Sequence, residues 1–204
     1  MTDQDLEQEI KFFVNNLGEI ESRIIDLGAI PIQARIKEYN LVFDNQSGDF
    51  TKNCQVLRLR KDKHNKLTFK GPGKIVDGIL LRKEIEIEVS DFDKTKSILD
   101  ALGYQISLTY EKFRSVYKFD EVYITLDEMP FGNFVEVEGQ DPTLIIHISA
   151  KLGLNWEHRI LCSYLDLFMN VKNNLGQEIK NLTFLDFEII SVTTDMLGVI
   201  PAEG

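Results

Sequence analysis

The chain is poor in cysteine and contains no long apolar run. Its 204 residues include two cysteines, Cys54 and Cys162, which lie too far apart in sequence to form the closely spaced thiol pairs of a metal site. The first residues lack the basic segment and apolar stretch of a secretion signal, and no apolar run reaches the length of a membrane span. We therefore expect two structural thiols in a cytoplasmic protein that does not enter a membrane.

Basic charge is also scarce. The chain has 23 lysines and arginines against 33 aspartates and glutamates, a formal net charge of -10. This surplus has the wrong sign for a general affinity for nucleic acid or anionic membranes, so neither is expected as a partner. A polyanionic ligand would need a local basic site.

The composition, 43% hydrophobic, is sufficient for one good core. We predict a single β-rich domain over residues 1–173. Residues 174–204 mix apolar and polar side chains without a clear period. They are predicted to form an extension that packs on the domain or is partly flexible.

Hydrophobic periodicity predicts an alternation of strands and helices. Apolar spacings of three and four, capping residues and closing glycines predict helices over 17–27, 92–102, 142–152 and 163–172. Two-residue alternation predicts strands over 7–12, 35–43, 56–61, 66–70, 79–89, 111–119, 122–127 and 134–138, of which 79–89 is the longest.

A weak internal repeat accompanies this pattern. The dipeptides Leu-Gly and Phe-Asp each recur at an offset of about 75 residues, between a helix and a strand pair. Two strand-helix-strand-strand-strand halves would close into one antiparallel barrel. Chance recurrence of dipeptides is the alternative.

The predicted strands carry ionic side chains at every second position. In the first strand Glu7, Glu9 and Lys11 alternate with apolar or neutral residues. Because successive side chains of a strand point to opposite faces, all three would project from one face. A solvated face of an antiparallel sheet explains one such strand. The same spacing recurs in 58–60, 68–70, 82–88, 112–114 and 136–138.

Repetition in strand after strand favours a barrel whose ionic face lines the lumen. The predicted helices have apolar stripes that would cover the apolar outer face. Such a lumen would be strained when empty, since two like charges about 5 Å apart at an effective dielectric near 20 repel by roughly 3 kcal/mol. Cationic side chains suit the oxygens of a phosphate chain, and carboxylates suit Mg²⁺ or Mn²⁺. The residues therefore predict a metal–triphosphate site, with salt bridges on a wet sheet face as the alternative.

The ionic motifs occur in a recognisable order. They are Glu-x-Glu-x-Lys at 7–11, followed by 57–60, 67–72, 82–86, 112–114, 126–127 and 131–139. This set resembles the triphosphate tunnel metalloenzymes, also called the CYTH superfamily after bacterial class IV adenylate cyclases and mammalian thiamine triphosphatase. The resemblance spans roughly residues 5 to 170. The forms LTFKGP and GNFVEVEG look most like the class IV cyclase branch.

The resemblance implies an α+β fold, an eight-stranded antiparallel tunnel with helices packed outside. Basic side chains would bind the triphosphate: Arg58, Arg60, Lys70, Arg82, Lys112 and Arg114. Carboxylates would hold one or two Mg²⁺ or Mn²⁺ ions: Glu7, Glu9, Asp127, Glu136 and Glu138, with Glu84 and Glu86 in a supporting role. Catalysis would involve Lys11, Asp127 and Glu136, with one ion orienting the triphosphate and a second activating the attacking oxygen.

The sequence leaves the reaction open. Attack by water on the terminal phosphorus would make a triphosphatase acting on tripolyphosphate, a nucleoside triphosphate or thiamine triphosphate. Attack by the ribose 3′-hydroxyl on the α-phosphorus of ATP would give cyclic AMP and pyrophosphate. We favour hydrolysis, because cyclisation needs a base-binding pocket that no segment identifies. A non-catalytic polyphosphate or nucleotide sensor is a third possibility, which the full set of carboxylates argues against, and a homodimer is left open.

Overall fold

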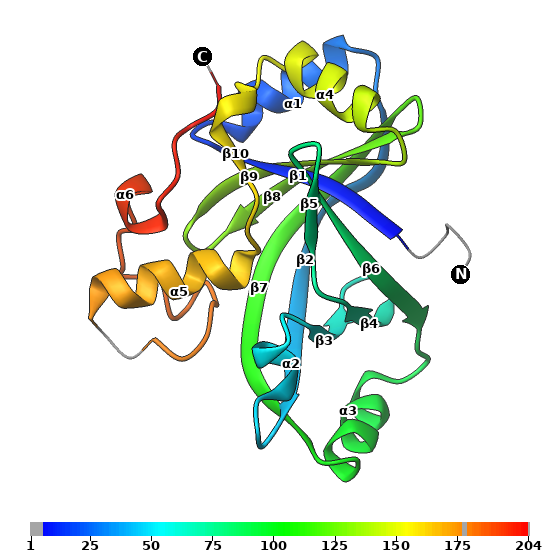
Figure 1. Cartoon of the computed structure of the whole chain (residues 1–204), viewed down its shortest axis with the longest axis vertical. Coiled ribbons are helices and arrows are strands. Elements are labelled where there is room, and N and C mark those ends of the chain that lie inside the picture. The colour runs from blue at the N-terminus through cyan, green and yellow to red at the C-terminus, as the bar shows by residue number, and fades with distance from the viewer. Residues whose placement is uncertain (1–5, 177–178, 204) are drawn as a thin grey trace.

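Two halves with the same order of elements build the barrel of the computed structural model, which describes residues 6–176 and 179–203 (Figure 1). The first half comprises β1 (Leu6–Val14), α1 (Leu17–Asp26), β2 (Ile30–Asn45), the short α2 (Asp49–Lys52), β3 (Val56–Lys61) and β4 (Asn65–Lys70). The short β5 (Lys74–Val76) leads to the second half, β6 (Ile79–Glu88), α3 (Phe92–Ala101), β7 (Tyr104–Phe119), β8 (Val122–Met129) and β9 (Gly132–Gly139). This is the predicted strand-helix-strand-strand-strand order, and α1 and α3 begin 75 residues apart.

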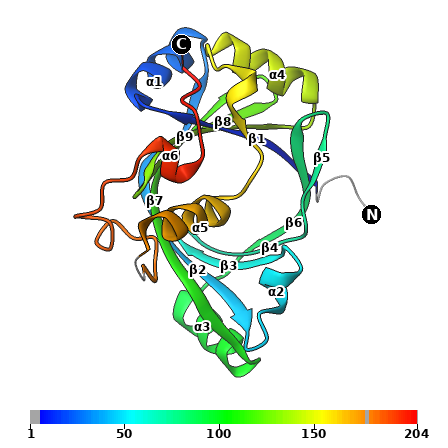
Figure 2. The same ribbon diagram turned by 60° about the vertical axis from the view of Figure 1, so that its left-hand side comes forward.

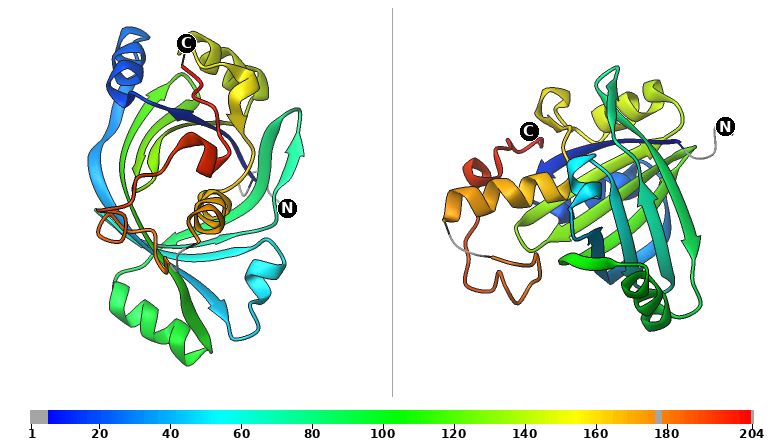
Figure 3. Two further views of the ribbon diagram at one scale, coloured as in Figure 1. Left: turned by 90° about the vertical axis from the view of Figure 1, so that its left-hand side faces the viewer. Right: turned by 60° about the horizontal axis from the view of Figure 1, so that its bottom comes forward.

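The strands close on themselves. The order is β1-β9-β8-β7-β2-β3-β4-β6, and β6 pairs back with β1 from Leu6↔Lys83 to Glu9↔Leu80. Every strand pairing is antiparallel, and the views along the barrel show the closed ring (Figures 2 and 3). The predicted α+β fold, an eight-stranded antiparallel barrel with helices outside, is confirmed.

Helices cover much of the apolar outer face. Helices α1 and α4 (Pro142–Lys151) pack over β1, β8 and β9, where Ile24 and Ile145 are buried against Ile10. Helix α3 covers β2 and β3 through Phe92 and Leu99. Coverage is incomplete, because Ile85 and Ile87 on the outer face of β6 are 43% and 55% exposed. The expectation that the whole apolar face is covered is therefore wrong at β6.

The prediction that 79–89 is the longest strand is wrong. Strands β2 and β7 each have 16 residues, against 10 for β6. The predicted range of β2 began too late, because Ile30, Pro31 and Gln33 pair with β7 through register shifts that break the two-residue alternation. The predicted range of β7 also began too late, since the strand starts at Tyr104. Short elements were also missed: α2, β5, a 3-10 helix at Trp156–His158, β10 (Arg159–Ile160) and α6 (Thr194–Leu197).

The C-terminal part lies against one end of the barrel. Helix α5 (Tyr164–Leu175) crosses this end (Figures 2 and 3). Beyond it, the Leu182 amide donates to the Thr109 carbonyl of β7, and the Ala202 amide donates to the Phe13 carbonyl of β1. The extension thus contacts the barrel at Leu182 and Ala202, and a domain boundary at residue 173 remains a prediction. No helix within the described ranges is long and apolar enough to cross a membrane.

The outer core generates a stability prediction. Ile145 and Ile146 are neighbours on α4, but Ile145 is fully buried under the helix and Ile146 is 40% exposed. We expect Ile145→Ala to lower the free energy of unfolding by about 2–4 kcal/mol, because it removes buried methylenes and leaves a cavity. Ile146→Ala is the matched control and should cost under about 1 kcal/mol. Urea denaturation measures both, and equal losses would contradict the packing of α4 on the barrel.

Candidate functional site

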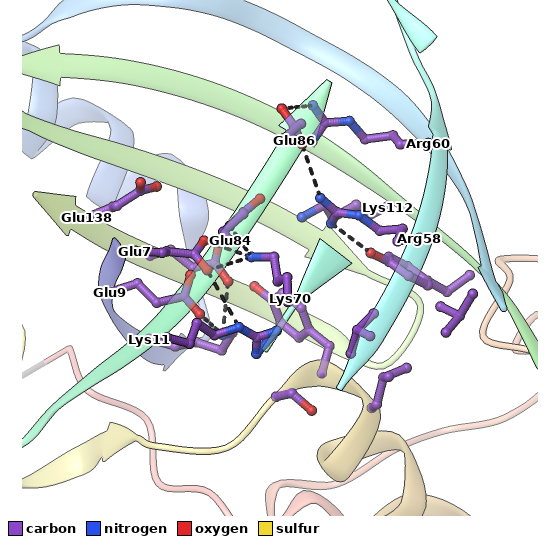
Figure 4. Close-up of a pocket in the computed structure, with 18 of the residues that line it drawn as sticks. Glu7, Glu9, Lys11, Arg58, Arg60, Lys70, Glu84, Glu86, Lys112 and Glu138 are labelled. Carbon is purple, nitrogen blue, oxygen red and sulfur yellow. Dashed lines mark hydrogen bonds and ion pairs between the residues drawn. The ribbon is translucent and has the colours of Figure 1, made fainter. Parts of the chain in front are cut away.

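The barrel encloses a cavity of about 280 Å³ that is lined mainly by ionic side chains (Figure 4). The residues come from strands far apart in sequence, and their side chains converge because they share one face of the closed sheet. Predicted site residues that line the cavity are Glu7, Glu9, Lys11, Arg58, Arg60, Lys70, Arg82, Glu84, Glu86, Lys112, Arg114, Glu136 and Glu138.

Asp127 is the predicted site residue that does not line the cavity. It is 0% exposed and lies among hydrogen-bond donors. Arg114 Nε donates to its Oδ1 at 2.6 Å, while Lys112 Nζ at 3.1 Å and Tyr164 Oη at 2.8 Å donate to its Oδ2. Roles for Asp127 in catalysis and metal binding remain predictions, and a metal ion would have to displace these donors.

The inward-facing rows change character along the barrel. They pass from ionic to apolar residues towards α5: Glu7-Glu9-Lys11-Phe13 on β1, Glu138-Glu136-Phe134 on β9, and Arg114-Lys112-Tyr110 on β7. Phe13, Phe134 and Tyr110 form a buried cluster with Leu167 and Phe168 of α5. The ionic lumen therefore ends at an apolar layer that holds α5 in place, and Ser163, Tyr164 and Leu165 border the cavity there.

Opposite charges are interleaved inside the lumen. Lys11 and Glu136 are cross-strand neighbours with 2.9 Å between Nζ and Oε1. Lys70, opposite Glu84, lies 2.8 Å from Glu84 Oε2 and 2.7 Å from both Glu7 oxygens. The expectation of uncompensated repulsion in the empty lumen is therefore wrong. The antiparallel register places acids opposite bases, which the sequence of a single strand does not reveal.

These ion pairs fix the charge of the central residues. Burial alone would lower the pKa of Lys11, but the carboxylates of Glu136 and Glu9 raise it above its ordinary value. Burial would raise the pKa of Glu136, but Lys11 and Arg114 hold it well below its usual range. Both residues are thus charged at neutral pH.

At the other end of the rows the carboxylates outnumber their cationic partners. Burial, acting with nearby carboxylates, raises the pKa of Glu9. The pKa of Glu138 is raised to about 7 by the low-dielectric surroundings of its carboxyl and by Glu7 and Glu9, although the residue as a whole is partly open to solvent. The pKa of Glu7 is also raised, by burial and by Glu84 against the opposing effect of Lys70. Carboxylates that are costly to ionise next to one another are donors suited to a hard divalent cation.

These carboxylates are not arranged as a finished metal site. Across residues 6–176 and 179–203, no three histidine, cysteine, aspartate or glutamate side chains converge closely enough to hold an ion. Lys70 occupies both oxygens of Glu7, and Lys11 lies 3.9 Å from Glu9. The donor chemistry fits Mg²⁺ or Mn²⁺, but a bound ion would have to displace Lys70 from Glu7, and Lys11 or Arg114 from Glu136.

The sequence did not predict several residues that contact the charged groups of the site, among them Glu38, Tyr110 and Tyr164. Glu38 on β2 lies next to the arginines, on the side away from the cavity. The Tyr110 hydroxyl on β7 accepts a hydrogen bond from Arg58 Nη1 at 3.1 Å. The Tyr164 hydroxyl on α5 donates to Asp127. The sequence carried a signal for two of them, because Glu38 precedes Asn40 by two residues and Tyr110 precedes Lys112 by two. Tyr164 had no such signal, since its position depends on where α5 docks.

The closed antiparallel barrel with an ionic interior defines a tunnel-type β-barrel protein. The CYTH domain model matches residues 5–143, and the chain belongs to the CYTH domain family. The resemblance stated from the sequence motifs is thereby confirmed.

Relatives of known structure or name share most of their length with this chain. A protein of Methanocaldococcus jannaschii named "Putative adenylate cyclase MJ0240" is 28% identical over 173 residues, covering 79% of this chain and 98% of the relative. The PH1819 protein of Pyrococcus horikoshii is 29% identical with a TM-score of 0.69, covering 80% and 98%. HpAC1 of Hippeastrum, called a "putative adenylyl cyclase" with "a dominant triphophatase activity", shares the fold at 19% identity and a TM-score of 0.61, covering 85% and 97%.

The raised pKa of Glu138 generates a pH prediction. The native protein holds the Glu138 proton more tightly than the unfolded chain, whose carboxyl has a pKa near 4.5, so Glu138 lowers stability as pH rises from 4.5 through about 7. We expect Glu138→Gln and the wild type to melt at the same temperature near pH 4.5, where the wild-type carboxyl is protonated in the folded state. At about pH 8 the variant should melt at a higher temperature than the wild type. Glu121→Gln, at a side chain 83% exposed, is the control. A melting difference for Glu138→Gln that does not change with pH would contradict the assignment.

Proposed function

We propose that the protein hydrolyses a triphosphate inside the tunnel with the help of a divalent cation, and that inorganic tripolyphosphate is the substrate that fits best. The observation that carries this proposal is the cavity itself, about 280 Å³ and lined mainly by charges. Pockets for organic ligands are lined predominantly by hydrophobic and aromatic side chains. A bare phosphate chain needs charges along its length and little apolar surface.

The arginines supply donors for the phosphate oxygens. Arg58 is bound by neutral partners, Tyr110 Oη at 3.1 Å and Thr68 Oγ1 at 3.3 Å, with the Glu86 carboxylate at 3.6 Å. Exchanging neutral partners for a phosphate oxygen strengthens the hydrogen bonds, because both groups are then charged. Arg60, Arg82, Lys112 and Arg114 line the same cavity and would extend the contact along the phosphate chain.

Lys11 and Glu136 lie at the centre of the lumen. Because its neighbours raise its pKa, Lys11 remains an ammonium group that donates hydrogen bonds, and it would orient the attacking water or a phosphate oxygen. Attack of the water oxygen on the terminal phosphorus breaks the phosphoanhydride bond and releases phosphate and pyrophosphate. Glu7, Glu9, Glu136 and Glu138 would hold Mg²⁺ or Mn²⁺, whose charge would stabilise the negative charge of the transferred phosphoryl group.

A class IV adenylate cyclase reaction is the second candidate. Next to α5 the cavity lining includes the apolar side chains Val42, Val56 and Leu165 beside the Tyr110 ring. This surface would accept part of an adenosine group, and the name of the M. jannaschii relative points the same way. The two reactions differ in the attacking oxygen and in the phosphorus attacked.

Product analysis tests the proposed function. We expect phosphate release to be fastest with tripolyphosphate when Mg²⁺ or Mn²⁺ is present, compared with ATP and thiamine triphosphate. Glu136→Gln should lower turnover about a hundredfold or more while the fold survives, because it removes a central charge with little change of shape. Cyclic AMP as the main product from ATP would favour the cyclase, and no product from any of these compounds would leave only a binding function.

Ligand-dependent melting tests binding separately from chemistry. Tripolyphosphate at 100 times its dissociation constant should stabilise the folded state by about 2.7 kcal/mol, which raises the melting midpoint by roughly 5–10 °C for a chain of this size. Glu136→Gln would serve as the non-hydrolysing protein. Adding Arg58→Ala should reduce the shift, whereas adding Lys37→Ala, at a side chain 48% exposed, should not. Equal shifts with orthophosphate and sodium chloride at matched ionic strength would show that the ligand acts only by screening.

A further inference from the structure

Behind the arginines lies a buried carboxylate that the proposed hydrolysis does not use. Glu38 of β2 is 1% exposed and does not line the cavity. Its Oε1 lies 3.6 Å from Arg60 Nη1 and 4.0 Å from Arg114 Nε, and its Oε2 lies 3.6 Å from Lys112 Nζ. One anion therefore faces three cations of the phosphate-binding lumen from the rear.

The contacts of Glu38 are longer than those of an ordinary buried ion pair. Charge-assisted N–H···O hydrogen bonds measure about 2.7–2.9 Å, and Glu38 Oε2 has no hydrogen-bond partner within the described chain. Glu38 thus attracts the cations without occupying their N–H donors. Asp127 differs, because Arg114 and Lys112 donate to it directly.

The charge of Glu38 is permanent at neutral pH. Burial alone would raise its pKa, but Lys112, Arg114 and Arg60 lower it to about 2. The cations Lys112, Arg114, Arg60 and Arg58 thus outweigh the effect of burial, and Glu38 keeps its negative charge in the physiological range.

Asn40, the next residue of β2 that faces inward after Glu38, also indicates that this buried polar layer has a functional role. Asn40 is 0% exposed, lies opposite Arg60 on β3 and Tyr110 on β7, and has no hydrogen-bond partner for either amide atom among the described residues. Buried polar groups are ordinarily hydrogen-bonded. The Glu38 carboxylate and the Asn40 amide, which lack such bonds beside a basic cluster, are therefore better explained by a role in function than by a role in stability.

We propose that Glu38 is a positioning residue, a fixed internal anion that weakens the hold of Arg60, Lys112 and Arg114 on phosphate chains so that pyrophosphate can leave. This inference rests on the proposed function of the same cavity. A negative charge behind cations opposes the binding of an anion in front of them, and at an effective dielectric near 20 the effect extends over several ångströms. Without it the site would bind products more tightly and release them more slowly.

Titration calorimetry with pyrophosphate in the absence of divalent cations tests the proposal. We expect Glu38→Gln to bind pyrophosphate about tenfold more tightly than the wild type and to be inhibited by it at correspondingly lower concentration during turnover. Glu38→Asp, which keeps the charge, should restore an affinity close to that of the wild type. Glu128→Gln is the matched control, because Glu128 pairs with Arg35 outside the cavity lining.

A second variant keeps the test independent of how well Glu38→Gln folds. Asn40→Asp adds a carboxylate next to Glu38 with almost no change in volume, and we expect it to bind pyrophosphate about tenfold more weakly. A purely structural role would lower the melting temperature of Glu38→Gln and leave its pyrophosphate affinity equal to that of Glu128→Gln, which overturns the proposal. Affinity unchanged or increased in Asn40→Asp also overturns it. If neither the wild type nor Glu38→Gln binds pyrophosphate, this inference fails, whereas the proposed hydrolysis is judged separately by the product analysis with divalent cations.

Discussion

Cross-strand pairing of opposite charges is the constraint on which this structure depends. A closed barrel cannot carry a row of buried cations unless acids stand beside them, because an unpaired buried charge is strongly destabilising. The antiparallel register supplies the pairs Lys11–Glu136, Lys70–Glu84 and Arg114–Asp127. A slip of one residue would turn Ile10 and Val137 inward and expose the ions. Fold and candidate site are therefore set by the same register.

The pairing is uneven along the lumen, and this gives the cavity distinct regions. Carboxylates with raised pKa values gather near Glu138, whereas Lys11 holds Glu136 ionised in the centre. Beyond them the rows become apolar and bind α5. The acidic region suits a divalent cation, and the arginines, several of whose partners are neutral or distant, suit phosphate oxygens. The lumen therefore offers both acidic and basic side chains, which suits a ligand made of a divalent cation and a polyanion.

The lumen also distinguishes two kinds of ion contact. Asp127 and Glu136 accept short hydrogen bonds from lysine and arginine, and so hold those side chains in place. Glu38 stands 3.6–4.0 Å from its cations and changes their potential without using their donors. In the proposed function, the reaction depends on which oxygen reaches which phosphorus.

The sequence by itself determined the features that are local in the chain. Two-residue alternation showed which side chains share a face, and apolar spacing showed the helices, because both follow from the geometry of a single element. The ordered ionic motifs also identified the family. Tertiary structure decided what depends on partners: that Asp127 lies behind Arg114, that Glu38 and Tyr164 join the site, and that acids and bases pair inside the lumen. Strand register and helix docking bring together residues far apart in sequence, and no local pattern specifies those distances.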